Sequence, residues 1–300
     1  MSRRIVDAHN HPNWCGKTAA GIVTDMDEKG IAQTWLLACE APAEEMDVVP
    51  RYYEKMDPRS VGLPLDRVTE CLQAYPDRFI GGWAPDPRRR HARARLKAAI
   101  DLHGIRVYGE LKLRMRYDEP DAIALYRFCG ESGMPVLFHL EAPAYRLKEL
   151  CGDIHAWPEW YGGDIAVVEN LCRACPETVF IAHGPGWWRE FSTGDGDRAA
   201  VYPDGPVQPG GHVTRILRAC PKLHADLSGT SGLNALARDP GHAFAFIGEF
   251  QDRLLFGRDG FGSDLIEFLN TLALDDETMD KILCRNADRL ARSDKETQHD

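Results

Sequence analysis

Residues 4–11 read RIVDAHNH, and this short β-rich stretch is the first of eight that alternate with helical stretches along the chain. The other seven strand candidates are Ala32–Cys39, Phe79–Ala84, Arg106–Leu113, Pro135–Leu140, Val179–His183, Leu223–Ser228 and Arg253–Gly257. The amphipathic helical stretches between them include Asp66–Tyr75, Ala92–Leu102, Asp121–Gly130, Asp164–Cys175, Val213–Cys220 and Ala243–Phe250. Strand and helix in regular alternation are typical of a parallel sheet with helices outside it.

Eight such units in 300 residues predict an α/β fold, a closed (β/α)8 TIM barrel. A doubly wound open sheet is the alternative, and it should carry a G-x-G-x-x-G turn after its first strand. The turn here reads NHPNWCG at residues 10–16 and lacks that pattern. No composition shift marks a domain boundary, so we expect residues 1–300 to form a single barrel domain.

Long connections follow the second, fifth and sixth predicted strands, at Glu40–Leu65, residues 141–163 and Trp187–Pro209. Long loops inside a compact domain are usually lids or binding loops. In a barrel, the loops after the strands lie on the face that carries the active site. The plain alternative is that they only cover the barrel mouth or mediate subunit contact.

Charge and composition exclude several classes of protein. The chain has 46 acidic and 36 basic residues and a net charge of −10, which disfavours a nucleic-acid partner. No run of 18 apolar residues is present, so no membrane span is expected. The start, MSRRIVDAHNHP, lacks the apolar region of a secretory signal. Nine scattered cysteines then indicate reduced thiols and a cytoplasmic protein.

Residues able to bind a metal ion recur where the predicted strands end. Alternation along the first strand puts Asp7, His9 and His11 on one face. Later strand ends add Glu110, His139, His183 and Asp259. In a closed barrel these ends converge on one axis, and imidazole with carboxylate suits Zn²⁺, Mn²⁺ or Fe²⁺.

Each of these residues also has a simple structural explanation. A single histidine such as His139 or His183 is often only a core residue with its hydrogen bonds satisfied. Asp259 alone would suit the N-cap of the last helix, and Glu110 alone would suit an ion pair. Four histidines and two carboxylates together at strand ends predict a metal site instead.

With these motifs the sequence resembles the amidohydrolase superfamily, in particular its amidohydrolase-2, decarboxylase-like branch of metal-dependent TIM-barrel enzymes. The resemblance rests on DAHNHP, GELKL, LFHLE, IAHGPG and FGRDGFG, in the order of the family. It extends to CRNADRLAR at residues 284–292, which is similar to the closing helix of that branch. It implies that His9, His11, His139 and Asp259 are metal ligands, and that His183 is either a ligand of a second ion or a catalytic histidine.

The fourth strand departs from this branch. Many superfamily members carry a lysine there that is carboxylated when it bridges two metals, whereas the decarboxylases have no metal-binding group. Glu110 takes the matching place here, as in some superfamily deacetylases and deoxyribonuclease-like hydrolases, and Lys112 is the rival candidate. We favour Glu110 because a carboxylate binds metal without modification. If Glu110 bridges two ions, one would be held by His9, His11 and Asp259 and the other by His139 and His183.

The predicted function is hydrolysis of a small amide, ester or lactone by a metal-activated water, with one or two ions, zinc being expected and manganese or iron the alternatives. Asp259 is the predicted base, and the metal or His183 would polarise the carbonyl. The alternative is a metal-dependent decarboxylase, a C–C lyase acting on a carboxylated aromatic or unsaturated acid, with one ion and Glu110 not coordinating. A barrel that binds without turnover is a third hypothesis, which the complete ligand set disfavours.

Substrate contacts are predicted from the loops after the strands. Arg114 follows the fourth strand in phase with Glu110, Arg146 follows the fifth, and Trp187 follows the sixth. Arginine beside tryptophan suits a ring-bearing or apolar small molecule with a carboxylate. The competing explanation is a solvated charged loop with tryptophans packed on the barrel rim. A homodimer is the expected assembly because relatives in this branch are often dimers.

Overall fold

The structure is a computed structural model that describes residues 3–40, 63–141, 162–193 and 200–292. In these segments the strands follow one another in chain order, and every hydrogen-bonded pair is parallel. The strands are β1 Ile5–Asn10, β2 Ile31–Cys39, β3 Phe79–Ala84, β4 Tyr108–Leu111, β5 Val136–His139, β6 Phe180–His183, β7 Leu223–Asp226 and β8 Leu254–Leu255. Each of the eight predicted strands is confirmed, most of them shortened by a few residues.

Two further contacts close the sheet into a barrel. The amide of Trp83 donates to the carbonyl of Val107 at 2.9 Å, which joins β3 to β4. The amide of Ala8 donates to the carbonyl of Phe256 at 2.9 Å, which joins β1 to the segment after β8. An open doubly wound sheet would have two free edges, so these contacts confirm the (β/α)8 barrel.

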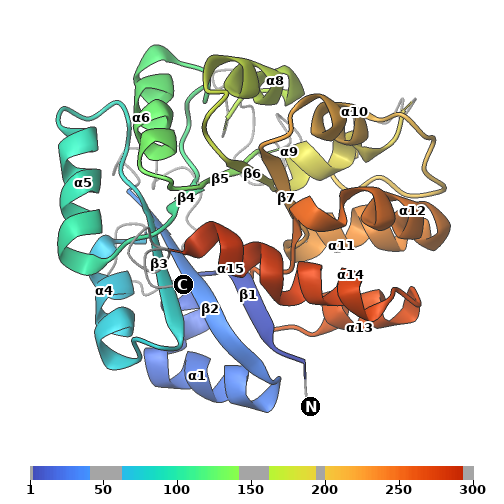
Figure 1. Cartoon of the computed structure of the whole chain (residues 1–300), viewed down its shortest axis with the longest axis horizontal. Helices are drawn as coiled ribbons and strands as arrows, with labels where there is room; N and C mark the ends of the chain where they lie inside the picture. Colours follow the sequence, from blue (N-terminus) through green and yellow to red (C-terminus); the bar gives the residue numbers. More distant parts are fainter. Residues whose placement is uncertain (1–2, 41–62, 142–161, 194–199, 293–300) are drawn as a thin grey trace.

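Helices surround the strands as a ring (Figure 1). The predicted helices correspond to α4 Leu65–Ala74, α5 Ala92–His103, α6 Pro120–Glu131, α8 Ile165–Ala174, α10 His212–Ala219 and α12 Pro240–Phe250. The structure adds α1 Ala19–Glu28, α9 Pro185–Trp188, α11 Gly229–Ala237, α13 Asp264–Thr271 and α14 Asp276–Asp280. The last helix, α15 Asn286–Ala291, lies within residues 284–292, where the resemblance implies a closing helix. Short 3₁₀ turns η1 Trp14–Gly16, η2 Arg189–Phe191 and η3 Gln251–Arg253 and a π-turn η4 Lys281–Arg285 complete the described elements.

The N-terminal end of the barrel is filled and capped. Val6, Leu137 and Ile181 belong to a buried interior cluster that also contains Ala287 and Ala291 of α15. Figure 1 shows α15 lying across the middle of the ring. The Nδ2 of Asn286, the first residue of α15, donates to the carbonyl of Leu254 at 2.8 Å and fixes the helix there. Access to the barrel axis is therefore left to the C-terminal ends of the strands.

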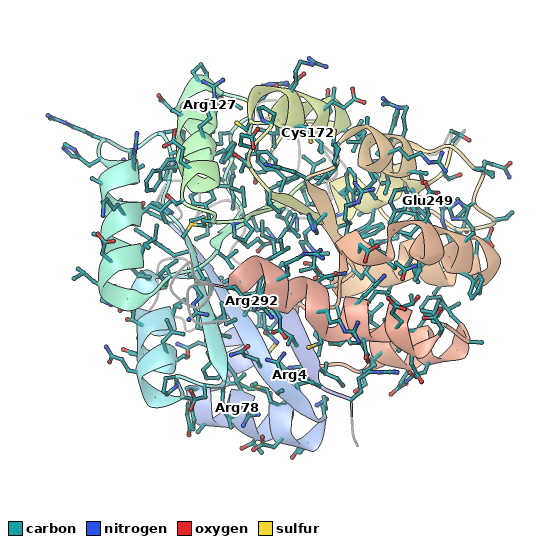
Figure 2. The ribbon with its side chains drawn as sticks, in the orientation of Figure 1. Arg4, Arg78, Arg127, Cys172, Glu249 and Arg292 are labelled. Atoms are coloured by element: carbon teal, nitrogen blue, oxygen red, sulfur yellow. The ribbon has the colours of Figure 1, made fainter. Side chains whose placement is uncertain are left out.

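Two arginine side chains, Arg4 and Arg78, connect neighbouring segments at this capped end of the barrel; both are labelled in Figure 2. Arg78 donates to the carbonyls of Ile31 and Ala32 at 3.0 Å each, at the start of β2. Arg4 pairs with Asp288 of α15. The first two strands are thus tied to the turn before β3 and to the closing helix.

The long connections are only partly covered by the structure. The predicted loops at Glu40–Leu65 and residues 141–163 lie almost wholly outside the described residues. The predicted loop at Trp187–Pro209 begins with the end of α9 and the turn η2, so its first part is helical. Within the part of the chain that the structure describes, no helix has both the length and the apolar character needed to cross a bilayer.

Candidate metal centre

Glu110 lies in the middle of the four predicted histidines at the C-terminal end of the barrel. Its Oε1 is 2.9 Å from Nδ1 of His139 and 3.8 Å from Nε2 of both His9 and His183. Its Oε2 is 3.6 Å from Nε2 of His11. One carboxylate from β4 therefore faces imidazoles from β1, from β5, from β6 and from the turn after β1.

Asp259 closes the same cluster from the segment after β8. Its Oδ1 is 3.3 Å from Nε2 of His11 and 3.9 Å from Nε2 of His9. Its Oδ2 is 3.8 Å from Nε2 of His183. The six predicted ligands thus meet in one place, which we call the ligand centre: His9, His11, Glu110, His139, His183 and Asp259.

The ligand centre contains three overlapping groups whose ligand atoms lie within 4.8 Å of one another. One group is His9, His11 and Glu110, and a second is Glu110, His139 and His183. The third is His9, His183 and Asp259. Because Glu110 belongs to two of these groups, the arrangement offers room for two neighbouring cation positions that share this carboxylate.

A break in strand pairing turns the β1 histidines inward. Val6 and Ala8 belong to the interior cluster, so strict alternation would send the next odd-numbered residues outward. The pairing of β1 with β2 shifts register between Asp7 and Asn10, and His9 then faces the ligand centre. The prediction that Asp7 shares the face of His9 and His11 is therefore wrong. Asp7 instead accepts a hydrogen bond from Arg258 Nε at 2.8 Å, outside the ligand centre.

A second break acts on β4. Val107 lies in the interior cluster, whereas Tyr108 and Leu111 pack in the outer core. The pairing with β5 shifts register between Tyr108 and Leu111, and Glu110 points inward from within that shift. Each of these two register shifts therefore directs a predicted ligand into the ligand centre. Irregularities of strand pairing are common next to active sites.

Hydrogen bonds at the second ring nitrogen hold three of the four histidines with Nε2 toward the ligand centre. His11 Nδ1 lies 2.9 Å from the carbonyl oxygen of Leu37, which can only accept. Asp226 Oδ2 lies 2.6 Å from Nδ1 of His9 and 3.1 Å from Nδ1 of His183. His139 is oriented the other way, with Nδ1 toward Glu110 and Nε2 3.3 Å from Glu141 Oε2.

The donor set fits a divalent cation. His9 Nε2 is buried and has no hydrogen-bond partner among the described residues, although two carboxylates lie within 3.9 Å of it. An unpaired buried imidazole nitrogen is costly unless a cation or another partner takes its lone pair. Nitrogen and carboxylate oxygen together suit Zn²⁺, Mn²⁺ or Fe²⁺.

Both carboxylates of the ligand centre are kept ionised. Burial raises the pKa of Glu110, but the charge of Lys112 and the hydrogen bond from His139 outweigh it and hold that pKa well below the usual range. Burial likewise raises the pKa of Asp259, and the hydrogen bond from His11 with the neighbouring histidines lowers it to about 2. Two anionic groups are therefore available to a cation at neutral pH.

The predicted substrate residues have different positions. Arg114 is buried beyond the end of β4, and Arg146 lies outside the described residues. Trp187 is fully buried in α9, where its ring packs 6.4 Å from that of Trp188. Their contacts with substrate stay predictions.

Asp226 is the functional candidate that sequence reasoning left without a role. It is the last residue of β7, and its side chain contacts His9 and His183 inside the barrel. Its role is indicated only by its contacts in the folded protein, because the histidines that it contacts come from β1 and β6. No spacing within β7 could reveal those partners.

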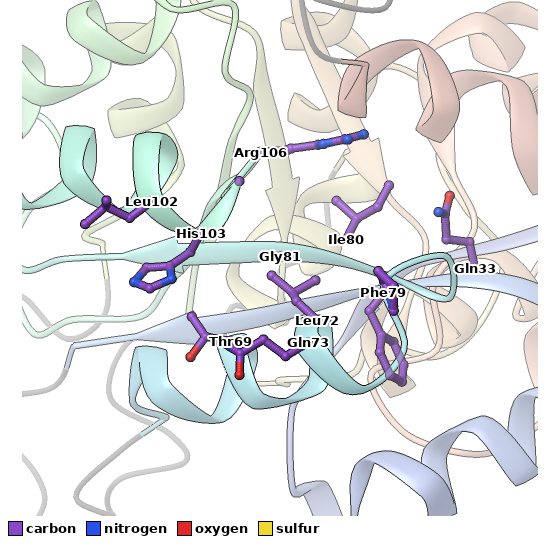
Figure 3. A pocket seen from close by; sticks show the side chains of 12 residues that line it. Gln33, Thr69, Leu72, Gln73, Phe79, Ile80, Gly81, Leu102, His103 and Arg106 are labelled. Carbon is purple, nitrogen blue, oxygen red and sulfur yellow. The ribbon is translucent and has the colours of Figure 1, made fainter.

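A cavity of about 330 Å³ lies at the other end of the barrel, away from the ligand centre (Figure 3). It is lined by residues at the starts of β2 and β3 and just before β4, among them Gln33, Gly81 and Arg106. No residue of the ligand centre lines it. The chemistry of the ligand centre therefore does not extend into this cavity.

The amidohydrolase family model matches residues 6–292 of the chain. No match was found among curated proteins. Among solved structures, an uncharacterized TIM-barrel protein from Bordetella bronchiseptica is 19% identical, with 96% of this chain and 98% of that chain covered and a TM-score of 0.59.

Other similar structures are of named enzymes, both hydrolases and decarboxylases. A probable 2-pyrone-4,6-dicarboxylic acid hydrolase from Acinetobacter baumannii is 14% identical, with 97% and 99% coverage and a TM-score of 0.55. A dihydroxybenzoic acid decarboxylase from a Polaromonas species, with manganese bound, is 16% identical, with 96% coverage of both chains and a TM-score of 0.55. At these identities the likeness concerns the fold.

Proposed function

Because this chain belongs to the amidohydrolase family, we propose that it is a hydrolase that uses two divalent ions, bridged by Glu110, to activate water against a small amide, ester or lactone. Family membership indicates a metal-dependent enzyme in the broader sense. The choice of hydrolysis over decarboxylation is the proposal.

The observation that carries this proposal is the position of Glu110. Its two oxygens lie between 2.9 and 3.8 Å from nitrogens of all four histidines, and its side chain is only 4% exposed. A carboxylate in this position suits a bridge between two cations, each completed by histidines. Two ions a few ångströms apart are a recurring arrangement in enzymes that hydrolyse small molecules.

The residues of the ligand centre divide the chemical tasks. When bound, the divalent ions supply Lewis-acid polarisation of a carbonyl and a water nucleophile at neutral pH. Asp259 accepts the proton of that water and returns it to the leaving group. Its side chain is 26% exposed, whereas that of Glu110 is 4% exposed, so Asp259 is the carboxylate that a substrate reaches. His183 is a ligand in the two-ion arrangement and faces the substrate in a one-ion arrangement.

Decarboxylation is the second candidate, with a different observation in its favour. Lys112 and Arg114 are buried cationic residues two and four positions after Glu110, and cationic side chains suit a carboxylated substrate. A decarboxylase from a Polaromonas species shares the fold. In this second candidate one ion is held by His9, His11, His139 and Asp259, and Glu110 is not a ligand.

Metal content tests the two-ion proposal. We would measure zinc and manganese per chain by mass spectrometry in the purified protein and in Glu110→Gln, with Glu177→Gln as a control that alters an exposed carboxylate paired with Lys222. We expect about two ions in the wild type and the control, and one or none in Glu110→Gln. One ion per chain in both the wild type and Glu110→Gln would contradict the two-ion proposal and favour the decarboxylase.

Activity assays then separate the two reactions. The metal-loaded protein would be given 2-pyrone-4,6-dicarboxylic acid and a panel of small esters, lactones and amides, and separately 2,6-dihydroxybenzoic acid with detection of carbon dioxide. We expect hydrolysis, lost in Asp259→Asn and retained in Glu177→Gln. Carbon dioxide release without hydrolysis would overturn the proposal.

A further inference from the structure

We propose that Asp226 is a positioning residue that fixes the ring orientation of both His9 and His183, so that the two cation positions depend on a single buried carboxylate. The inference rests on the metal centre of the proposed function. It needs both cation positions, and therefore the two-ion form of that centre.

A single oxygen atom makes the decisive contacts. Asp226 Oδ2 is 2.6 Å from His9 Nδ1 and 3.1 Å from His183 Nδ1. The same oxygen accepts a hydrogen bond from Ser228 Oγ at 2.8 Å. His183 Nδ1 also lies 3.2 Å from Ser228 Oγ, whose hydroxyl proton is donated to Asp226. Because an ionised carboxylate only accepts and this hydroxyl oxygen is then an acceptor as well, we expect both imidazoles to carry their proton on Nδ1. Their Nε2 lone pairs are then directed toward Glu110 and Asp259.

The surroundings of Asp226 hold its carboxylate in one orientation. Its side chain has no exposed surface, and its Oδ1 accepts the amide of Ser228 at 2.8 Å. Its carbonyl accepts Trp188 Nε1 at 3.0 Å, which anchors β7 to α9. A Cβ built on Gly257 would lie 2.9 Å from Oδ1, so the opposite side is closed by backbone.

The two histidines share the group that contains Asp259, and each also belongs to a second group without the other. His9 shares a group with His11 and Glu110, and His183 shares a group with Glu110 and His139. The rings of His9 and His183 are 4.3 Å apart, so a rotation of one would displace the other. Carboxylates that hydrogen-bond metal-binding histidines set their tautomer and basicity, and their loss costs about 10- to 100-fold in metal affinity. In this chain one such carboxylate serves both groups.

The first test needs no variant. Long-range ¹H–¹⁵N correlation spectra of the metal-free wild type report the tautomer of each histidine, with assignments taken from single His→Gln variants. We expect the Nδ1–H tautomer for both His9 and His183. An Nε2–H tautomer at either residue would overturn the proposal.

The second test compares Asp226→Asn with Asp86→Asn. Asp86 is equally buried after β3, but it pairs with Arg88 and contacts no histidine. An asparagine at position 226 cannot accept from both imidazoles and from Ser228 as a carboxylate does. We expect a loss of about 10- to 100-fold in zinc affinity for both ions, by chelator competition, together with altered tautomers. If Asp226→Asn has the same zinc affinities and histidine tautomers as Asp86→Asn, the positioning role of Asp226 is refuted.

Failure of this inference differs from failure of the proposed function. A wild type that binds no zinc or manganese would remove the metal-dependent reaction, whatever the tautomers are. A wild type that binds two ions and keeps both affinities in Asp226→Asn would leave the reaction standing and remove only the role of Asp226.

Discussion

Arg258 donates a hydrogen bond from Nε to Asp7 Oδ2 at 2.8 Å, and this ion pair joins the segment after the last strand to the first strand. Arg258 also reaches Asp25 of α1 at 2.6 Å, and its amide donates to Asp7 Oδ1 at 2.9 Å. Both charged side chains of the pair are almost inaccessible, at 3% and 0% exposed. The seam where the barrel closes is therefore held by a buried charge network next to the ligand centre.

Removing the arginine should destabilise the protein strongly. In Arg258→Leu the carboxylate of Asp7 stays buried without its cation, whereas Asp25 keeps its pair with Lys29. Breaking a buried pair in this way costs about 3–5 kcal/mol. Urea unfolding of the metal-free protein measures this change. Lys97→Ala is the control because it breaks an exposed pair with Asp101 on α5, for which we expect about 0.5 kcal/mol or less. Equal changes in the free energy of unfolding for Arg258→Leu and Lys97→Ala would contradict the stabilising role of the buried Arg258 pair.

Two glycines offer a matched test of the packing behind the ligand centre. A Cβ on Gly257 would lie 2.8 Å from His9 Cβ and 2.9 Å from Asp226 Oδ1. Gly257→Ala should therefore destabilise by about 1–3 kcal/mol and weaken metal binding. A Cβ on Gly248 of α12 would meet nothing within 4 Å, so Gly248→Ala should stabilise by about 0.5–1 kcal/mol. Thermal melts and metal content measure both effects. A Gly257→Ala protein that is more stable than Gly248→Ala would refute the packing argument.

The fold was predictable because strand and helix patterns follow from local residue periodicity. The phase of His139 with Leu137 and of His183 with Ile181 holds in the structure, since β5 and β6 are regular. Helix α1 was not predicted, although the sequence holds a local signal for it. Its N-cap is Thr18, whose Oγ1 accepts the amide of Gly21 at 3.2 Å.

The positions of Asp7 and Asp226 could not be predicted in this way. Asp7 follows a strict alternation in the sequence, but the register shift in β1 depends on pairing with β2 and places it beside Arg258. Arg258 itself points away from the ligand centre toward Asp25 of α1, as its phase relative to Asp259 indicates. Contacts between distant strands decide such positions, and they are absent from any local pattern.

Metal binding should be visible as added stability. A ligand at about 100 times its dissociation constant stabilises the folded state by about 2.7 kcal/mol, so zinc or manganese should raise the melting temperature and a chelator should lower it. His11→Gln removes an imidazole that faces both Glu110 and Asp259 and should shrink this difference. Differential scanning calorimetry with and without chelator measures it. Identical melting temperatures in the wild type under both conditions would argue against a resident ion.

His224 gives the protein a defined sensitivity to acid that is separate from the ligand centre. Burial lowers the pKa of its imidazole to about 4, whereas in the unfolded chain the pKa is about 6.5. Between these values the unfolded state binds the proton more readily, so the free energy of unfolding falls as the pH drops below about 6.5. Above that pH this contribution is fully present.

The loss due to His224 should amount to about 3 kcal/mol once the pH is below 4. His224→Gln cannot take up this proton, so in a chelator its unfolding free energy should fall less between pH 7.5 and 4.5 than that of the wild type. The control His103→Gln, at an exposed position at the end of α5, should retain the dependence of the wild type on pH. Urea unfolding at both pH values provides one difference for each of the three proteins. A difference in His224→Gln equal to that of the wild type would show that this histidine is not the acid-sensitive group.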